Sequence, residues 1–469
     1  MKDTLETGWT ADLVWIGAKF ESGVALLTDA SGRVTGFSRN PNDLASATRF
    51  PNRAILPGLV NVHSHSFQRA IRARTEHRTS ATTDTFWTWR EAMYRAANLL
   101  SPEDVYHVAR MAFLEMLLSG ITTVGEFHYL HNEPDGTRYQ DPNLLPMQVI
   151  RAAENVGLRI ALLRAAYARA GWKKPENRGQ ARFITPNAET FISDTEALRS
   201  AVSKLSAAGG AWIGVAPHSI RSLPLEYLLR AAEYARAEDL PLHMHAAEQP
   251  EEVEQCLEEH GLRPIELLDK HGVLDERFTA IHAIHVNGDE IASLGRGKVH
   301  VCACPTSERN LGDGVVPADR LMNSGPRICF GSDSNIQINL FEDARELEYH
   351  LRMQKLQRAV LATESEETRL AERLFQSATL RGAEALGVPV GEFEPGKAAD
   401  FFAVDLDDPS IAGSEPKSLL SNLVFSLERT AIRDVFVGGR QIVEEGRHPR
   451  QVEIVNEFKN VQRRLWGQL

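Results

Sequence analysis

Eight short apolar segments, each turning polar at its C-terminal end, alternate with amphipathic helical stretches along most of this chain. The segments are AILPGLVNVH, ITTVGEFHYL, RIALLRAAY, AWIGVAPHS, LPLHMHAAE, FTAIHAIHV, KVHVCACPTS and RICFGSDS. Buried strands that alternate with helices are typical of repeated βα units and a parallel sheet. Eight such units predict an α/β fold, a (β/α)8 barrel of the TIM type, in which chemistry lies at the carboxyl ends of the strands.

The two ends of the chain follow a different pattern. Residues 11–56 hold short apolar runs broken by turns, and the segments VGEFEPGKAADFFAVDL and RDVFVGGRQIVEEG after residue 388 look similar. Both patterns favour antiparallel strands joined by glycine-rich turns. We therefore expect residues 1–56 and 388–469 to build one small β-sandwich domain that includes a C-terminal helix. The barrel, residues 57–387, would be inserted in it.

Composition excludes several classes of partner. With 469 residues and a formal net charge of −11, the chain lacks the clustered positive charge that nucleic acids or anionic membranes require. Its four cysteines are too few for a disulfide scaffold and favour structural thiols in a reducing compartment. We see no secretory signal and no run near the about 18 apolar residues of a membrane helix. These observations predict a cytoplasmic protein, and they leave room for a small anionic substrate.

Histidines and carboxylates gather at the predicted strand ends. His63 and His65 close the first strand, and residues i and i+2 of a strand point to the same side. Three further strand ends carry such groups: His245 and Glu248 after the fifth, His282 after the sixth and Asp333 after the eighth. Each alone is compatible with an ordinary polar residue, but together they predict one metal site. Imidazoles with one carboxylate and an open position form the ligand set of catalytic Zn²⁺.

This constellation, together with the return segment EPGKAADFFAVDL, resembles the amidohydrolase superfamily over nearly the whole chain. Binuclear members of that superfamily bridge two metals with a lysine or an acid on the fourth strand. Here the fourth strand ends in APHSIR, which contains neither. The resemblance therefore implies a mononuclear site and the deaminase branch, with Glu248 three residues after the ligand His245.

Four further segments, HSFQRA, DTFWTWR, EFHYLH and NLGDG, resemble the formimidoylglutamate deiminase family of histidine degradation. That resemblance implies hydrolysis of N-formimidoyl-L-glutamate to N-formyl-L-glutamate and ammonia, one Zn²⁺ per subunit, a dicarboxylate substrate and a homodimer. The metal ligands would be His63, His65, His245 and Asp333, and the catalytic residues Glu248 as proton donor, His282 as hydrogen-bond partner and Asp333 as acceptor of the water proton. The substrate-binding residues would be Gln68, Arg90, Tyr129, His218 and Arg221.

Less specific interpretations stay open. Arg90 could be a helix-surface residue, and Gln68 and Tyr129 could form loop hydrogen bonds. We expect the run Arg72, Arg74 and Arg78 to be a solvated face. The whole chain could instead be a deaminase of a purine or adenosine derivative, a chlorohydrolase-type enzyme, or a metal-free scaffold without activity. Several carboxylate-directed arginines favour the dicarboxylate.

Overall fold

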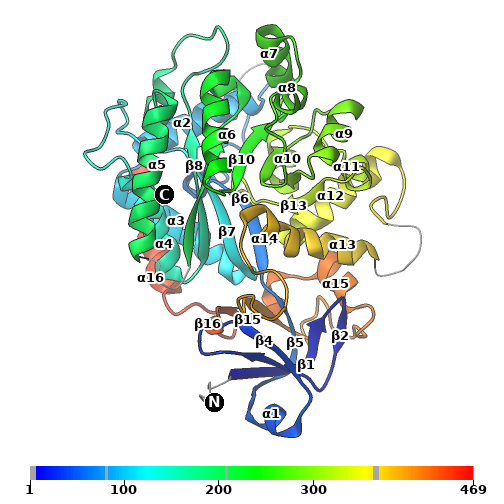
Figure 1. Cartoon of the computed structure of the whole chain (residues 1–469). Helices are drawn as coiled ribbons and strands as arrows, with labels where there is room; N and C mark the ends of the chain where they lie inside the picture. Colours follow the sequence, from blue (N-terminus) through cyan, green and yellow to red (C-terminus); the bar gives the residue numbers. More distant parts are fainter. Residues whose placement is uncertain (1–6, 80–82, 206–209, 363–368, 468–469) are drawn as a thin grey trace.

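The computed structural model describes residues 7–79, 83–205, 210–362 and 369–467 (Figure 1). Eight parallel strands follow one another in chain order around a nearly closed barrel. They are β6 (Leu59–Ser64), β7 (Ile121–His128), β8 (Arg159–Ala166), β9 (Ala211–Pro217), β10 (Leu242–Ala246), β11 (Phe278–His282), β12 (His300–Ala303) and β13 (Arg327–Phe330). Each of the eight predicted segments contains one of these strands, so the predicted barrel is confirmed.

Helices connect the strands and surround the barrel (Figure 1). Helix α3 shows how its sequence specifies it: Ser101 caps its first turn in a capping box with Asp104, Pro102 is its first residue, and Gly120 follows its end with φ +78°. The α-helices between the barrel strands are α2 (Phe86–Leu99), α3 (Pro102–Leu118), α4 (Leu144–Val156), α5 (Ala188–Leu205), α6 (Leu225–Ala237), α7 (Pro250–His260), α8 (Pro264–Lys270), α9 (Gly288–Arg296), α10 (Pro305–Leu311) and α11 (Ala318–Ser324), and α12 (Leu340–Lys355), α13 (Arg369–Ala378) and α14 (Leu380–Leu386) follow β13. Three short 3₁₀ helices, η1 (Ser66–Ile71), η2 (Arg178–Phe183) and η3 (Ile220–Ser222), lie in loops that follow β6, β8 and β9.

Both chain ends contribute to a second, mixed sheet below the barrel in Figure 1. Its order is β16 (Arg440–Val443), β15 (Ile432–Val437), β14 (Phe401–Asp405), β5 (Thr48–Pro57), β1 (Thr7–Ile16), β3 (Ala25–Thr28) and β4 (Val34–Ser38), with β2 (Lys19–Glu21) paired to β1. The expectation of purely antiparallel strands is wrong at one pair, because β1 and β5 are parallel. Between them the chain forms the β3–β4 hairpin and the helix α1 (Pro41–Ser46). It therefore enters β5 in the same direction in which it ran along β1.

The chain passes from the mixed sheet to the barrel at Gly58. The predicted segment AILPGLVNVH is therefore two strands, since β5 ends at Pro57 and β6 begins at Leu59. A side chain at Gly58 would place its Cβ 2.2 Å from Oγ1 of Thr122 on β7. Glycine is the residue that lets the chain turn this close to the neighbouring strand.

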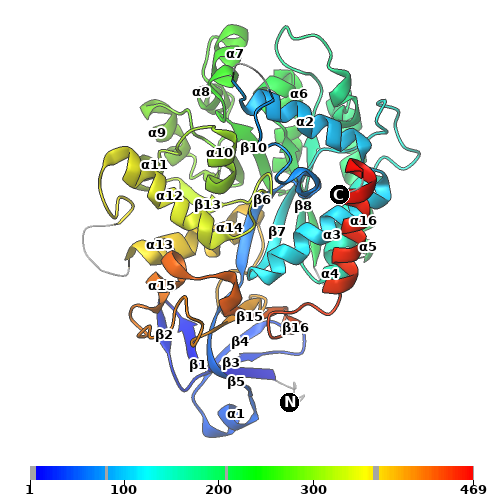
Figure 2. The ribbon, with the colours of Figure 1, turned by 180° about the vertical axis from the view of Figure 1, so that it is seen from behind.

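The C-terminal segment contains α15 (Leu419–Ser426), the 3₁₀ helix η4 (Arg429–Ala431) and α16 (Gln451–Trp466). Helix α16 runs beside α3 of the barrel rather than on the mixed sheet (Figure 2). Nη2 of Arg110 on α3 lies 2.6 Å from Oε1 of Glu453, and the side chains of Gln462 and Trp466 both donate to the carbonyl of Ala70 in η1. The end of the chain thus holds the segment that follows the His63–His65 pair.

Arginines on this segment are structural. Nε of Arg69 and Nη1 of Arg72 each lie 2.6 Å from the carboxylate of Glu115 on α3, and the Arg74 guanidinium lies 4.8 Å from the Trp466 ring. The prediction of a solvated face is therefore wrong for Arg72 and Arg74, because partners distant in the chain cover them. Across the described ranges, no helix is both long enough and apolar enough to cross a lipid bilayer.

Candidate metal centre and substrate pocket

Three imidazoles and one carboxylate converge at the carboxyl ends of the barrel strands. One ligand atom each from His63, His65, His245 and Asp333 lies within 4.8 Å of all the others, and all four residues are buried. Nε2 of His63 and Nε2 of His65 lie 3.2 and 3.4 Å from Oδ1 of Asp333. The sequence placed these residues on three separate strand ends, and the structure brings them to one point.

Backbone carbonyls set the orientation of two of these imidazoles. Nδ1 of His65 lies 2.8 Å from the carbonyl oxygen of Phe127, and Nδ1 of His245 lies 2.9 Å from that of His218. A carbonyl only accepts, so each Nδ1 carries the hydrogen and each Nε2 keeps a lone pair. Such an arrangement is typical of metal-binding histidines. Nδ1 of His63 is buried without a hydrogen-bond partner.

Burial keeps the three imidazoles neutral, as metal ligands must be. Desolvation lowers the pKa of His63 to about 3 and also lowers the pKa of His65 and of His245. Burial alone would raise the pKa of Asp333, but the hydrogen bond with His63 and the charges of His63, His282 and His65 together outweigh it and hold that pKa below its usual value. Three neutral imidazoles with one carboxylate fit a divalent ion such as Zn²⁺.

His282 differs from these ligands. Its Nδ1 lies 3.2 Å from Oε1 of Glu308 on α10, and its Nε2 lies 4.0 Å from Oε1 of Glu248. Burial opposes a charge on His282, but hydrogen bonds with Cys304 and Glu308 raise its pKa well above the usual value. The backbone of His282 is left-handed, with φ 71°, a conformation that costs free energy for a residue with a side chain. Because its Nδ1 is held by Glu308 and its pKa is raised, His282 can donate a hydrogen bond to a group at the metal centre.

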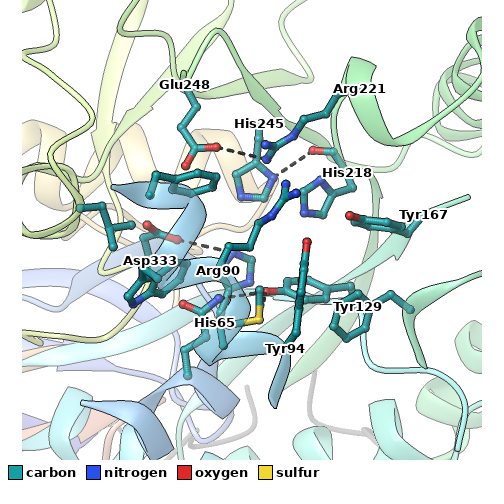
Figure 3. Close-up of a pocket in the computed structure, with 16 residues that line it drawn as sticks. His65, Arg90, Tyr94, Tyr129, Tyr167, His218, Arg221, His245, Glu248 and Asp333 are labelled. Atoms are coloured by element: carbon teal, nitrogen blue, oxygen red, sulfur yellow. Dashed lines mark hydrogen bonds and ion pairs between the residues drawn. The ribbon is translucent and has the colours of Figure 1, made fainter. Parts of the chain in front are cut away.

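A pocket opens directly above this centre (Figure 3). It includes all five predicted substrate-binding residues and Glu248. The lining residues are His65, Gln68, Phe86, Trp89, Arg90, Met93, Tyr94, Tyr129, Tyr167, Phe183, His218, Arg221, His245, Glu248, Leu311 and Asp333. His63 and His282 pack beneath this lining, with ring centroids 4.9 and 5.6 Å from that of His245.

Two guanidinium groups that line the pocket have nitrogens without acceptors in the described part of the chain. Arg221 is buried, and its Nη2 lies 3.5 Å from Oε2 of Glu248, while its Nη1 has no hydrogen-bond partner among the described residues. The Arg90 guanidinium lies 4.4 Å from the Trp87 ring, and its buried Nε also has no partner. No carboxylate of the described chain lies within ion-pair distance of Arg90. Buried donors without acceptors are costly, so these groups favour an anionic ligand.

Sequence analysis did not identify several residues of this site: Tyr94, Tyr167, Phe183 and Glu308. Two of them had a signal in the sequence. Tyr94 is four residues after Arg90 on one helix, which places both on the same face, and Tyr167 directly follows β8. The remaining two, Phe183 and Glu308, lie in the short helices η2 and α10, where no periodic pattern indicates them.

The other histidines near strand ends have structural partners. Each donates to a backbone carbonyl over 2.7–3.0 Å: His128 to Leu130, His131 to Ala165, His243 to Ala385 and His285 to Asp313.

Comparison with known proteins places the chain among metal-dependent hydrolases. Residues 54–442 match the model of the amidohydrolase family. The chain is 37% identical to a formimidoylglutamate deiminase of Pseudomonas aeruginosa, over 87% of this chain and 88% of that protein. It is 32% identical to an 8-oxoguanine deaminase of the same organism, over 84% and 82%. A crystal structure of an amidohydrolase from Brucella melitensis superposes with a TM-score of 0.88 and 31% identity, covering 98% of this chain and 99% of that one.

Removal of one imidazole should abolish metal binding. We expect the purified chain to contain about one divalent ion and His245→Ala to contain almost none, as measured by plasma mass spectrometry. A ligand at a thousand times its Kd stabilises the native state by about 4 kcal/mol, so a chelator should lower the melting temperature of the unsubstituted chain but not that of the variant. His243→Asn, on the same strand, is the matched control and should keep its metal. Full metal content in His245→Ala would contradict this centre.

Proposed function

The chain belongs to the amidohydrolase family, and from this premise we propose that it hydrolyses N-formimidoyl-L-glutamate to N-formyl-L-glutamate and ammonia. As a member of this superfamily it is a deaminase, a hydrolase of C–N bonds. The observation that supports the specific substrate is the pair Arg90 and Arg221: both line the pocket beside the metal ligands, and each has a buried nitrogen without a hydrogen-bond partner among the described residues. A substrate with two carboxylates satisfies both guanidinium groups.

We propose that a single Zn²⁺ occupies the centre. His63, His65, His245 and Asp333 would hold it, leaving room for a water molecule on the pocket side. When bound, such an ion lowers the pKa of water enough to supply a nucleophile at neutral pH. The absence of lysine or acid from residues 216–221, at the end of β9 and directly after it, supports one ion rather than two.

The chain's own residues would handle the protons. Water adds to the amidine carbon, the bond from this carbon to its terminal nitrogen breaks, and ammonia leaves. Asp333 would accept the proton that water loses, and Glu248 would deliver a proton to the departing nitrogen; both residues line the pocket. His282, whose Nδ1 is held by Glu308, would donate a hydrogen bond from Nε2 to the oxygen that becomes bonded to carbon.

Arg221 would serve both the acid and the substrate. Its Nη2 lies beside Glu248, and its Nη1 has no hydrogen-bond partner among the described residues. A carboxylate bound at Nη1 would therefore lie close to Glu248, the proton donor. The carboxylate on the α-carbon of the substrate is the one adjacent to the formimidoyl nitrogen. We therefore assign this carboxylate to Arg221 and the side-chain carboxylate to Arg90.

Ammonia release from candidate substrates tests the proposal. The purified chain should release ammonia from N-formimidoyl-L-glutamate, with kcat/KM at least about a hundredfold above that for 8-oxoguanine, guanine or adenosine. The aromatic residues Phe86 and Trp89 in the pocket could stack on a base, so the assay must include the purine substrates. Preincubation with a chelator should abolish release, and added Zn²⁺ should restore it. Faster turnover of a purine would overturn the assignment, and no turnover with full metal would favour an inactive scaffold.

Substitution of Glu248 should separate chemistry from metal binding. We expect Glu248→Gln to keep its metal and its melting temperature but to lower kcat by about 10²–10⁴-fold, the usual contribution of a positioned proton donor. Glu254→Gln, on the exposed face of α7, is the control. A kcat near that of the unsubstituted chain would remove Glu248 from this role.

Substitution of the two arginines should have different effects on the kinetics. Arg90→Met should raise KM for N-formimidoyl-L-glutamate at least about tenfold and leave kcat nearly unchanged, because Arg90 contacts no group that reacts. Arg221→Met should raise KM and also lower kcat, since Arg221 holds Glu248. Arg230→Met, at an exposed surface pair with Glu233, is the control. An unchanged KM in Arg90→Met would contradict its role in binding.

A further inference from the structure

Tyr94 and Tyr167 lie in the pocket, and neither has a role in the reaction proposed above. Tyr94 comes from α2 and Tyr167 from the end of β8, and both side chains are buried. Figure 3 shows their hydroxyl ends pointing into the pocket, toward Arg90 and His218. The ring of Tyr94 lies 5.4 Å from the Arg90 guanidinium, and that of Tyr167 lies 4.7 Å from the His218 ring.

One glutamine contacts both hydroxyl groups. Nε2 of Gln180 lies 2.6 Å from the phenol oxygen of Tyr94 and 2.8 Å from that of Tyr167. An amide nitrogen only donates, so each phenol oxygen accepts from Gln180 and keeps its own hydrogen for another acceptor. Within the described residues, neither hydroxyl donates to a protein acceptor. Gln68 contacts Tyr129 in the same way, over 2.9 Å.

Gln180 is held through its segment rather than through its own amide oxygen, since its Oε1 is buried without a hydrogen-bond partner among the described residues. It belongs to η2, where the neighbouring Arg182 donates to the carbonyls of Ala97, Leu100 and Asn132 over 2.6–3.0 Å. Phe183, at the end of η2, packs with its ring centroid 5.6 and 5.8 Å from those of Tyr94 and Tyr167. The loop between β8 and α5 thus forms one wall of the pocket and sets the direction of both phenol hydrogens.

The chemistry of this wall favours an anion. The buried Nε of Arg90 has no acceptor among the described residues, and each phenol oxygen, which accepts from Gln180, keeps a hydrogen that it can donate. Burial raises the pKa of Tyr94, so its hydrogen is retained. A carboxylate has two oxygens with about four acceptor positions, enough for a guanidinium and two hydroxyl groups. A carboxamide has only one acceptor oxygen and would leave donors unpaired.

We propose that Tyr94 and Tyr167 are specificity-determining residues that donate hydrogen bonds to the side-chain carboxylate of the substrate, and that Gln180 is the positioning residue that directs both hydroxyl hydrogens toward it. This inference rests on the proposed function and specifies its substrate class: a dicarboxylate whose distal group must be charged. According to this proposal, the pocket wall formed by η2 selects against a substrate in which an amide replaces the side-chain carboxylate.

Binding of the product tests the proposal without turnover. We would measure the Kd of N-formyl-L-glutamate and of N-formyl-L-glutamine by calorimetry for the metal-loaded chain and for Tyr94→Phe and Tyr167→Phe. Each variant should bind N-formyl-L-glutamate about tenfold more weakly, the loss expected for a hydrogen bond to a charged group, and should bind the glutamine analogue with little change. In turnover, KM should rise and kcat should stay within about twofold. Tyr227→Phe is the matched control. The Tyr227 hydroxyl lies outside this pocket and is buried without a hydrogen-bond partner among the described residues.

Substitutions of Gln180 test the positioning role. In Gln180→Glu a carboxylate would accept both phenol hydrogens and turn them from the pocket, so the preference for N-formyl-L-glutamate over N-formyl-L-glutamine should fall at least about tenfold. Gln180→Leu removes the donor, and its melting temperature and metal content report whether the wall still folds. A merely structural role would weaken both ligands equally.

The two proposals can fail separately. Unchanged Kd values in both tyrosine variants, equal losses for the two ligands, or no binding of N-formyl-L-glutamate by the unsubstituted chain would overturn the assignment of Tyr94 and Tyr167. Tight binding of N-formyl-L-glutamate that the phenylalanine variants weaken, with no ammonia release from N-formimidoyl-L-glutamate, would instead overturn the reaction and keep the carboxylate site.

Discussion

The backbone of Asp333 lies between those of His63 and His65, and this contact both closes the barrel and builds its metal centre. The amide of Asp333 donates to the carbonyl of His63 over 2.9 Å, and the amide of His65 donates to the carbonyl of Asp333 over 2.9 Å. A single bridge between Ser64 and Asp333 joins the first and last strands here. Asp333 adopts a left-handed φ of 44°, a cost that the two hydrogen bonds offset. Because three ligands share one backbone contact, the closure of the fold fixes their separation.

Burial has opposite consequences on the two sides of the site. Around the ligands, desolvation keeps the imidazoles neutral, and carbonyls of Phe127 and His218 turn Nε2 of His65 and His245 toward one point. Across the pocket, burial leaves donors of Arg90 and Arg221 without acceptors. A chain with a net charge of −11 can thus offer donors to an anion, because two guanidinium groups line its pocket and nearby oriented groups outweigh distant, screened surface charges. Such a division suits a reaction in which three neutral imidazoles and one carboxylate would hold a cation and an anionic substrate would bind beside it.

The order of elements was readable from the sequence because it rests on local rules. The eight apolar segments follow from the need of parallel strands to be buried on both faces, and α3 from the cap that Ser101 and Asp104 form. His63 and His65 could be identified as a pair because residues i and i+2 of a strand point to the same side. Arg90 and Arg221 could be named only through resemblance to a family. The break of AILPGLVNVH at Gly58 was missed, because an apolar run does not show which of two sheets each half joins.

What the sequence determined by itself was the set of strand ends and the residue types that stand on them, since periodicity and capping act over a few residues. The tertiary structure alone decided the partners: Gln180 with Tyr94 and Tyr167, Glu308 with His282, and Glu115 with Arg72. These pairs join segments from 13 to 86 residues apart. A hydrogen bond requires its two atoms within about 3 Å at a suitable angle, and no pattern along a chain specifies that. Only the packing of loops over a closed barrel brings such donors and acceptors together.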